Sequence, residues 1–302
     1  MALAGTCRAV SVVSMTFKIG VMCGASGAIV RTFIARHAPQ LQAAGIELAV
    51  VVLDDDLPAR RAPVRHLWRL ATRQARIAGC SAPVALGRIL VYRALEGLGS
   101  EPEPTPPFPA GLTIVQAPTL NASSAALAVR AAGCDLVCLM GARFLTRRTL
   151  RAVGAPVVNI HSSDPRRIRG GPVVVWEVLA DEPQIALVVH EATEVLDAGA
   201  ILAQASQPIL YCGGLGVTTA ATMAAARPIV ADLFEQVIRD AADGTLRRTS
   251  FAPGPLKVTP SIAKSLRADL LCRYRSARWA ATGSVREDGG TPPASDPPSG
   301  RS

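Results

Sequence analysis

Short runs of aliphatic and β-branched residues recur along the chain, and Gly, Pro or polar residues bound each run. Such runs are typical of buried strands in a parallel sheet. They predict strands over 17–23, 46–53, 112–116, 135–140, 156–160, 185–190 and 200–210. Apolar residues at helical spacing predict helices over 28–43, 60–99 (two helices, split near 79–83), 123–132, 146–153, 172–180, 217–242 (irregular near Pro228) and 260–280.

The order of these elements predicts the fold class. A strand, a Gly-rich turn, a helix and a second strand that ends in Asp54 form the first βαβ unit of a doubly wound sheet. We therefore expect an α/β fold with a Rossmann-like, mostly parallel sheet, a helical insertion and a short helical C-terminal appendage. Gly20, Gly24 and Gly27 do not form the G-x-G-x-x-G fingerprint, which disfavours an NAD(P) site.

Composition divides the chain into segments. We expect an extension or misplaced start over 1–16, a main domain over 17–245, a basic helical appendage over 246–282 and a disordered tail over 283–302. Inside the main domain, 57–110 is predicted to be a helical insertion that ends in a Pro-rich linker. The tail is rich in Pro, Gly and Ser and cannot bury a core.

Charge and cysteine content indicate which binding partners and which cellular compartment to expect. The net charge of +9 comes mainly from Arg, which indicates either anionic partners such as phosphate, polyglutamate or nucleic acid, or a solvated basic surface. Arg65, Arg69, Arg73 and Arg76 form a stripe at helical spacing, which is either a contact for phosphates or a solvated face. The seven cysteines form no Cys-x-x-Cys pair, so we expect the reducing cytoplasm and neither a disulfide framework nor a metal site. No apolar run is long enough for a membrane span.

Candidate chemistry gathers after the strand over 156–160. Asn159 and His161 are two residues apart and therefore lie on the same side of this strand. The carboxyl end of such a strand is where an open α/β sheet places its ligand. A third polar residue, Asp197, follows the next apolar run.

Four pieces of sequence carry a resemblance to a known family. They are Asn159-Ile-His161, the loop that ends in Arg169-Gly170, Val188-Val-His190 and Leu196-Asp-Ala-Gly199. In this order they resemble the folate-dependent formyltransferases, which include glycinamide ribonucleotide, methionyl-tRNA and sugar-nucleotide formyltransferases. The resemblance implies a formyltransferase fold over 17–245, with 10-formyltetrahydrofolate as the formyl donor and His190 as structural support. It also implies a cofactor-binding set of Met140, Gly141, Arg143, Phe144, Leu145, Glu194 and Leu196.

Formyl transfer to an amine passes through a tetrahedral intermediate with a negative oxygen. The side-chain amide of Asn159 can donate a hydrogen bond to that oxygen at any pH. His161 can donate when charged or take the amine's proton when neutral. Asp197 would orient the imidazole and pass the proton on through water. Neither a metal nor a covalent intermediate is required.

The acceptor and some alternatives stay open. We expect a small anionic amine, such as an amino sugar nucleotide or another phosphorylated or carrier-bound amine. Initiator-tRNA formylation is disfavoured because 243–302 leaves no room for a C-terminal β-barrel, and we expect neither a nucleic-acid partner nor a membrane. Where the family loop often reads Pro-Ser-Leu-Leu-Pro, this chain has Ser162-Ser-Asp-Pro-Arg166, which bears on acceptor recognition. A 10-formyltetrahydrofolate hydrolase, a catalytically impaired folate- or nucleotide-binding relative, and a homo-oligomer all remain open.

Overall fold

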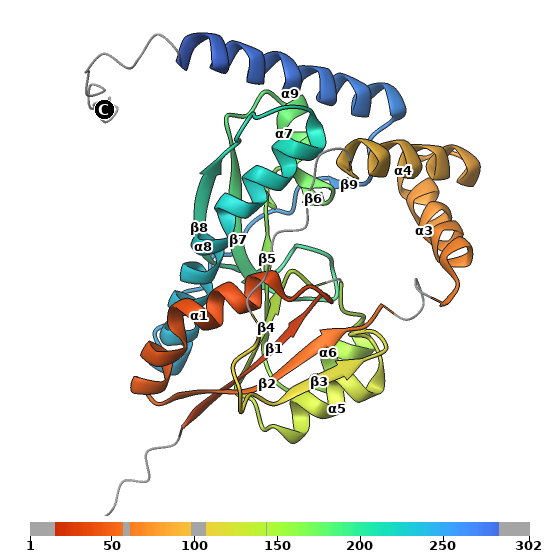
Figure 1. The fold of residues 1–302 in the computed structure, drawn as a ribbon. Helices are drawn as coiled ribbons and strands as arrows, with labels where there is room; N and C mark the ends of the chain where they lie inside the picture. The colour runs from red at the N-terminus through yellow and green to blue at the C-terminus, as the bar shows by residue number, and fades with distance from the viewer. Residues whose placement is uncertain (1–15, 57–60, 98–106, 143, 284–302) are drawn as a thin grey trace, which may run out of the picture.

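A seven-stranded sheet forms the centre of the fold (Figure 1). The computed structural model describes residues 16–56, 61–97, 107–142 and 144–283. The strand order is β3-β2-β1-β4-β5-β7-β8. The first five strands pair in parallel, and β7 is antiparallel to both β5 and β8. The strands are β1 (Phe17–Cys23), β2 (Ile46–Asp54), β3 (Ile114–Ala117), β4 (Leu136–Met140), β5 (Val157–His161), β7 (Gln184–Glu191) and β8 (Ile201–Pro208).

Helices cover both faces of this sheet, which confirms the predicted α/β class. Helices α1 (Ala28–Ala43) and α8 (Leu215–Ala242) pack on one face, and α5 (Ser123–Ala131) and α6 (Arg147–Val153) lie on the other (Figure 1). Alternate strand residues therefore enter different cores. In β5, Val158 belongs to the α1–α8 core and Val157 to the α5–α6 core. Asn159 and His161 point to the same side as Val157.

Helix α8 contradicts one prediction. It runs without a break from Leu215 to Ala242 with Pro228 inside it, whereas the sequence predicts a helix that is broken or irregular there. Pro removes one helical hydrogen bond, but packing holds the turns on either side. Ala226 and Val230, on the two sides of Pro228, are both buried in the core.

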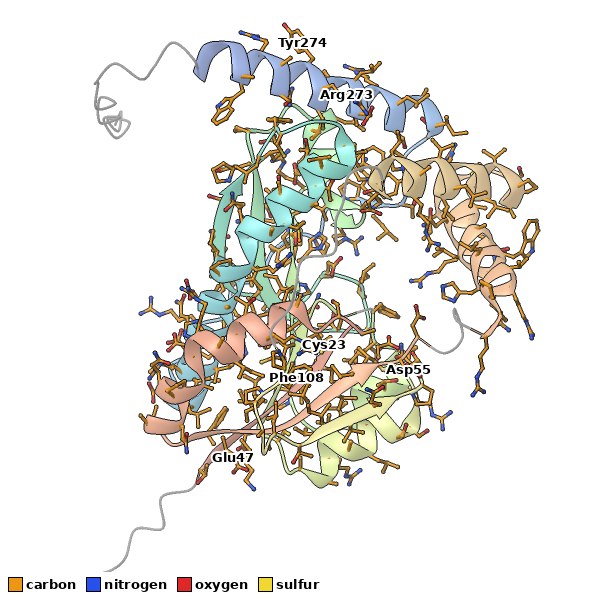
Figure 2. The ribbon with its side chains drawn as sticks, in the orientation of Figure 1. Cys23, Glu47, Asp55, Phe108, Arg273 and Tyr274 are labelled. Carbon is orange, nitrogen blue, oxygen red and sulfur yellow. The ribbon has the colours of Figure 1, made fainter. Side chains whose placement is uncertain are left out.

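The remaining elements lie around the carboxyl end of the parallel strands. The insertion between β2 and β3 contains α3 (Pro63–Ala78) and α4 (Ala82–Gly97), which share a small core of their own. Helix α9 (Ile262–Gly283) crosses α4, α7 (Val173–Leu179) and α8. A short parallel pair, β6 (Arg169–Gly170) and β9 (Leu256–Lys257), joins the loop after β5 to the C-terminal segment. In Figure 2, Cys23 at the end of β1 and Asp55 just beyond β2 mark the edge of the sheet at which the candidate site lies.

Several predictions fall on parts of the chain outside the described residues. These parts are 1–15, 57–60, 98–106, residue 143 and 284–302, and they include most of the predicted extension, linker and tail. Among the described helices, none is long and apolar enough to cross a membrane.

Candidate active site

Strand pairing places Asn159 opposite a histidine. In the antiparallel register of β5 and β7, Asn159 is the partner of His190. The Nδ2 atom of Asn159 lies 3.3 Å from Nε2 of His190, and Nδ1 of His190 lies 2.8 Å from the carbonyl oxygen of Glu191. A carbonyl only accepts, so Nδ1 of His190 donates to Glu191, and Nε2 faces the Asn159 amide. The Asn159 side chain has two amide hydrogens, so at least one remains for a ligand.

Asp197 reaches the same point from the loop between β7 and β8. Its Oδ2 atom lies 3.6 Å from Nδ1 of His161, and its Oδ1 atom lies 3.5 Å from Nε2 of His190. The backbone N–H of Gly170 also donates to Oδ2, at 2.9 Å. The structure therefore brings the predicted amide, imidazole and carboxylate together, with His190 between the amide and the carboxylate.

Burial and hydrogen bonding fix the protonation of this group. His161 is 7% exposed and Asp197 is 6% exposed. Burial lowers the pKa of His161 below its usual value and outweighs the opposing attraction of Asp197. Burial alone would raise the pKa of Asp197, but its bonds to His190 and Gly170 and the nearby His161 together hold that pKa below its usual value. At neutral pH His161 is thus neutral and Asp197 is ionised.

The tautomer of His161 follows from its second contact. Its Nε2 atom lies 2.9 Å from the carbonyl oxygen of Ile168, so Nε2 carries the hydrogen and donates it. In the neutral ring Nδ1 then holds a lone pair that faces the carboxylate of Asp197. A proton that arrives at Nδ1 would complete an imidazolium–carboxylate pair. The His161–Asp197 unit is therefore built to accept one proton, and Nε2 is already engaged in a hydrogen bond to Ile168.

The unusual loop after β5 delivers the Ile168 carbonyl to His161. The backbone oxygen of Asp164 accepts from the N–H groups of Arg167 and Ile168, and the Asp164 carboxylate accepts from Arg166. Ser163 is fully buried and donates to the carboxylate of Glu177, whose pKa is raised by burial. Polar contacts thus hold the turn that leads from His161 to Ile168.

The glycines of the two motifs permit close approaches of the backbone. A Cβ atom on Gly199 would lie 2.0 Å from the carbonyl oxygen of Glu191. Gly170 has a φ of +76°, and a Cβ atom there would lie 2.6 Å from the carbonyl oxygen of Lys257. Arg169 donates to the backbone oxygens of Gly254 and Leu196, at 2.7 and 3.0 Å. These contacts hold the Asp197 loop against β6 and β9, so the Arg-Gly and Asp-x-Gly pieces position the carboxylate.

The polar side chains of the site face a cavity of about 840 Å³. Asn159, His161, His190 and Asp197 line one part of it. Phe144, Leu145, Leu150 and Leu196 supply apolar lining, and His66, Arg69, Arg73, Arg93 and Lys257 supply a basic part. This volume falls within the range typical of small-molecule sites.

Part of the chain matches a known protein family. Residues 95–223, which include the amide, the imidazole and the carboxylate, match the family model described as formyl transferase. We refer to this matched part of the chain, which is less than half of its length, as the formyltransferase domain. Methionyl-tRNA formyltransferases from Lacticaseibacillus casei and Lactobacillus johnsonii are 25% and 28% identical over 122 and 123 residues. These matches cover 40% of this chain and only 37% and 38% of the relatives.

The fold of the formyltransferase domain agrees with a solved structure. Glycinamide ribonucleotide transformylase 1 from Symbiobacterium toebii superposes with a TM-score of 0.50 at 22% identity, over 80% of this chain and 92% of that one. At this identity the likeness supports the Rossmann-like fold.

The residues that the resemblance assigns to the cofactor lie in different places in this formyltransferase domain. Phe144, Leu145 and Leu196 line the cavity. Of the described residues, Met140 is buried in the core and Gly141 follows it with a φ of +66°, and neither is among the lining residues. Glu194 lies at the surface and pairs with Arg147 and Arg151. Arg143 is outside the described residues.

Sequence reasoning missed two parts of the site in the formyltransferase domain. Asn121 fixes the loop after β4, because its amide donates to the Phe144 oxygen at 3.0 Å and accepts from the Thr146 N–H at 2.7 Å. No local pattern signals these contacts. The second part is the basic lining, of which the helical spacing of Arg69 and Arg73 gave the only sign.

Proposed function

We propose that this protein is an N-formyltransferase that moves a formyl group from 10-formyltetrahydrofolate to an amine. The observation that carries the proposal is the convergence of Asn159, His161 and Asp197 in one cavity, with the remaining lone pair of His161 directed at the carboxylate. The apolar lining from Phe144, Leu145 and Leu196 suits the flat ring system of a folate.

Each residue has a step in the proposed reaction. The Asn159 amide donates to the oxygen that becomes negative when the amine attacks the formyl carbon, a contact typically worth about 10²–10³ in rate. His161 takes the amine's proton on Nδ1, and Asp197 stabilises the imidazolium that results. When the bond between the formyl carbon and the folate nitrogen breaks, His161 returns the proton to that leaving nitrogen. No other acid or base is needed.

The proposal extends to the chemical class of the amine acceptor. A phosphorylated amine, such as an amino sugar nucleotide, or a carrier-bound amine suits a cavity that contains Arg69, Arg73, Arg93 and Lys257. We place the reaction in the cytoplasm. The six cysteines among the described residues are free, which suits a reducing compartment.

A screen of candidate amines tests the proposal. Each amine is incubated with 10-formyltetrahydrofolate and the full chain, and mass spectrometry detects the gain of one formyl group. The product should form with wild type and with His37→Gln, a change on α1 outside the cavity, and should be lost with His161→Gln. Formate release that equals turnover without any amine would identify a hydrolase instead. Tetrahydrofolate binding without any turnover would identify a binding protein.

A further inference from the structure

One side of α3 forms a wall of the cavity. His66, Arg69, Leu70, Arg73, Gln74 and Ile77 line it, and their spacing places them on a single helical face. The opposite side of α3 supplies Ala71 and Ala75 to the core shared with α4. The orientation of the helix is therefore set by packing, and the packing turns two guanidinium groups toward the site.

Arg69 and Arg73 of this wall, together with Arg93 of α4, bring positive charge to the cavity. Across 16–56, 61–97, 107–142 and 144–283, no carboxylate forms an ion pair with Arg69, Arg73 or Arg93. Other arginines do find such partners, as Arg36 does with Asp232 and Arg167 with Glu182. With Lys257, four cations line the cavity against the two carboxylates of Asp56 and Asp197.

The arrangement of these cations suits an oxyanion. Arg69 and Arg73 are one helical turn apart, so their Cβ atoms lie roughly 5–6 Å from each other and both guanidinium groups can reach one ligand group. The guanidinium carbon of Arg73 lies 5.6 Å from the centre of the Phe144 ring, which places it beside the loop that lines the cavity. Guanidinium groups bind phosphate and carboxylate through paired hydrogen bonds.

We infer that Arg69, Arg73 and Arg93 form a subsite for a phosphate or carboxylate group of a ligand whose reacting end lies at His161 and Asp197. The inference rests on the proposed function for the identity of that reacting end. Two ligands could supply the anion: a phosphorylated amine acceptor, or the glutamate carboxylates of the folate donor. The site chemistry is the same for both.

Calorimetry on the full chain tests the subsite with two probes, inorganic pyrophosphate and a γ-linked triglutamate peptide. We expect one probe to bind, and Arg73→Gln or Arg69→Gln to weaken its binding roughly tenfold, the cost of one charged hydrogen bond. Arg76→Gln is the matched control because Arg76 is exposed on the same helix but is not among the lining residues. Its affinity should equal that of wild type. Binding should also weaken as salt rises.

The outcomes distinguish a phosphorylated acceptor from the folate donor as the ligand, and they test the subsite independently of the proposed formyl transfer. Preference for pyrophosphate assigns the subsite to a phosphorylated acceptor, and preference for triglutamate assigns it to the donor. Binding of neither probe at millimolar concentration overturns the subsite, and so does equal loss in Arg73→Gln and Arg76→Gln. Thermal unfolding of each variant checks that it folds. The probes carry no formyl group, so the result does not depend on whether formyl transfer occurs.

Discussion

Replacement of Asp197 by Asn tests the proposed proton acceptor most directly. The change keeps the shape of the side chain and removes its charge. The amide oxygen of the variant can still accept from the Gly170 N–H at the position of Oδ2, and its NH₂ can donate to His190 at the position of Oδ1. The loop should therefore keep its conformation, and the effect should fall on the reaction.

The size of the effect follows from the pair that forms during the reaction. Once His161 holds the amine's proton, its charge lies 3.6 Å from the Asp197 carboxylate, and both side chains are almost fully buried. At an effective dielectric constant of about 20, an attraction over this distance is worth roughly 4–5 kcal/mol. Loss of that attraction raises the barrier by a similar amount, which corresponds to about 10³ in kcat.

The assay compares turnover with binding. Release of tetrahydrofolate under saturating amine and donor reports kcat, and calorimetry with tetrahydrofolate reports binding. We expect kcat to fall about 10³-fold while the affinity for tetrahydrofolate stays near that of wild type. Asp232→Asn is the matched control, because Asp232 is an exposed carboxylate on α8 that pairs with Arg36 and does not line the cavity. A folded Asp197→Asn variant with a kcat close to wild type would refute the assignment of this carboxylate.

Three further predictions follow from the same contacts. Asn159→Ala removes the oxyanion donor, so kcat should fall by about 10²–10³ with little change in tetrahydrofolate affinity, and an equal loss of both would contradict that role. Because burial lowers the pKa of His161, its neutral form persists in mild acid, so the pH profile of kcat/KM should drop only below a midpoint under about 6.5; a midpoint above neutrality would exclude His161 as the base. Gly199→Ala forces a Cβ atom to within 2.0 Å of the Glu191 oxygen and should cost roughly 1–3 kcal/mol in thermal unfolding, whereas Gly97→Ala, with nothing within 4 Å, should cost nothing.

The sheet and part of the site were predictable because they depend on local periodicity. Buried strands read as apolar runs, and the two-residue step from Asn159 to His161 fixes their common side. The parallel order of the first five strands then puts both side chains at the carboxyl edge. For Asp197 the sequence supplied only a position after the next strand, and the resemblance supplied its role.

The contacts that complete the site join residues far apart in sequence, and these have no periodic signal. Ile168 selects the tautomer of His161 through a backbone oxygen, and Arg169 reaches the backbone of Gly254 across 85 residues. The contacts of Glu194 also have no signal in the sequence pattern. The resemblance assigned Glu194 to the cofactor-binding set, but its carboxylate pairs with Arg147 and Arg151 at the surface of α6. Neither outcome depends on hydrophobic pattern, so neither could be read from it.

The Ile168 carbonyl also decides which way a proton can travel. An imidazole with both nitrogens accessible can take up a proton at one nitrogen and release a proton from the other. In His161, Nε2 donates its hydrogen to the Ile168 oxygen, so only Nδ1 is available for proton transfer. A proton that His161 takes up from the cavity must therefore leave from the same nitrogen, so the uptake of a proton from the amine and its delivery to the leaving nitrogen would use the same atom.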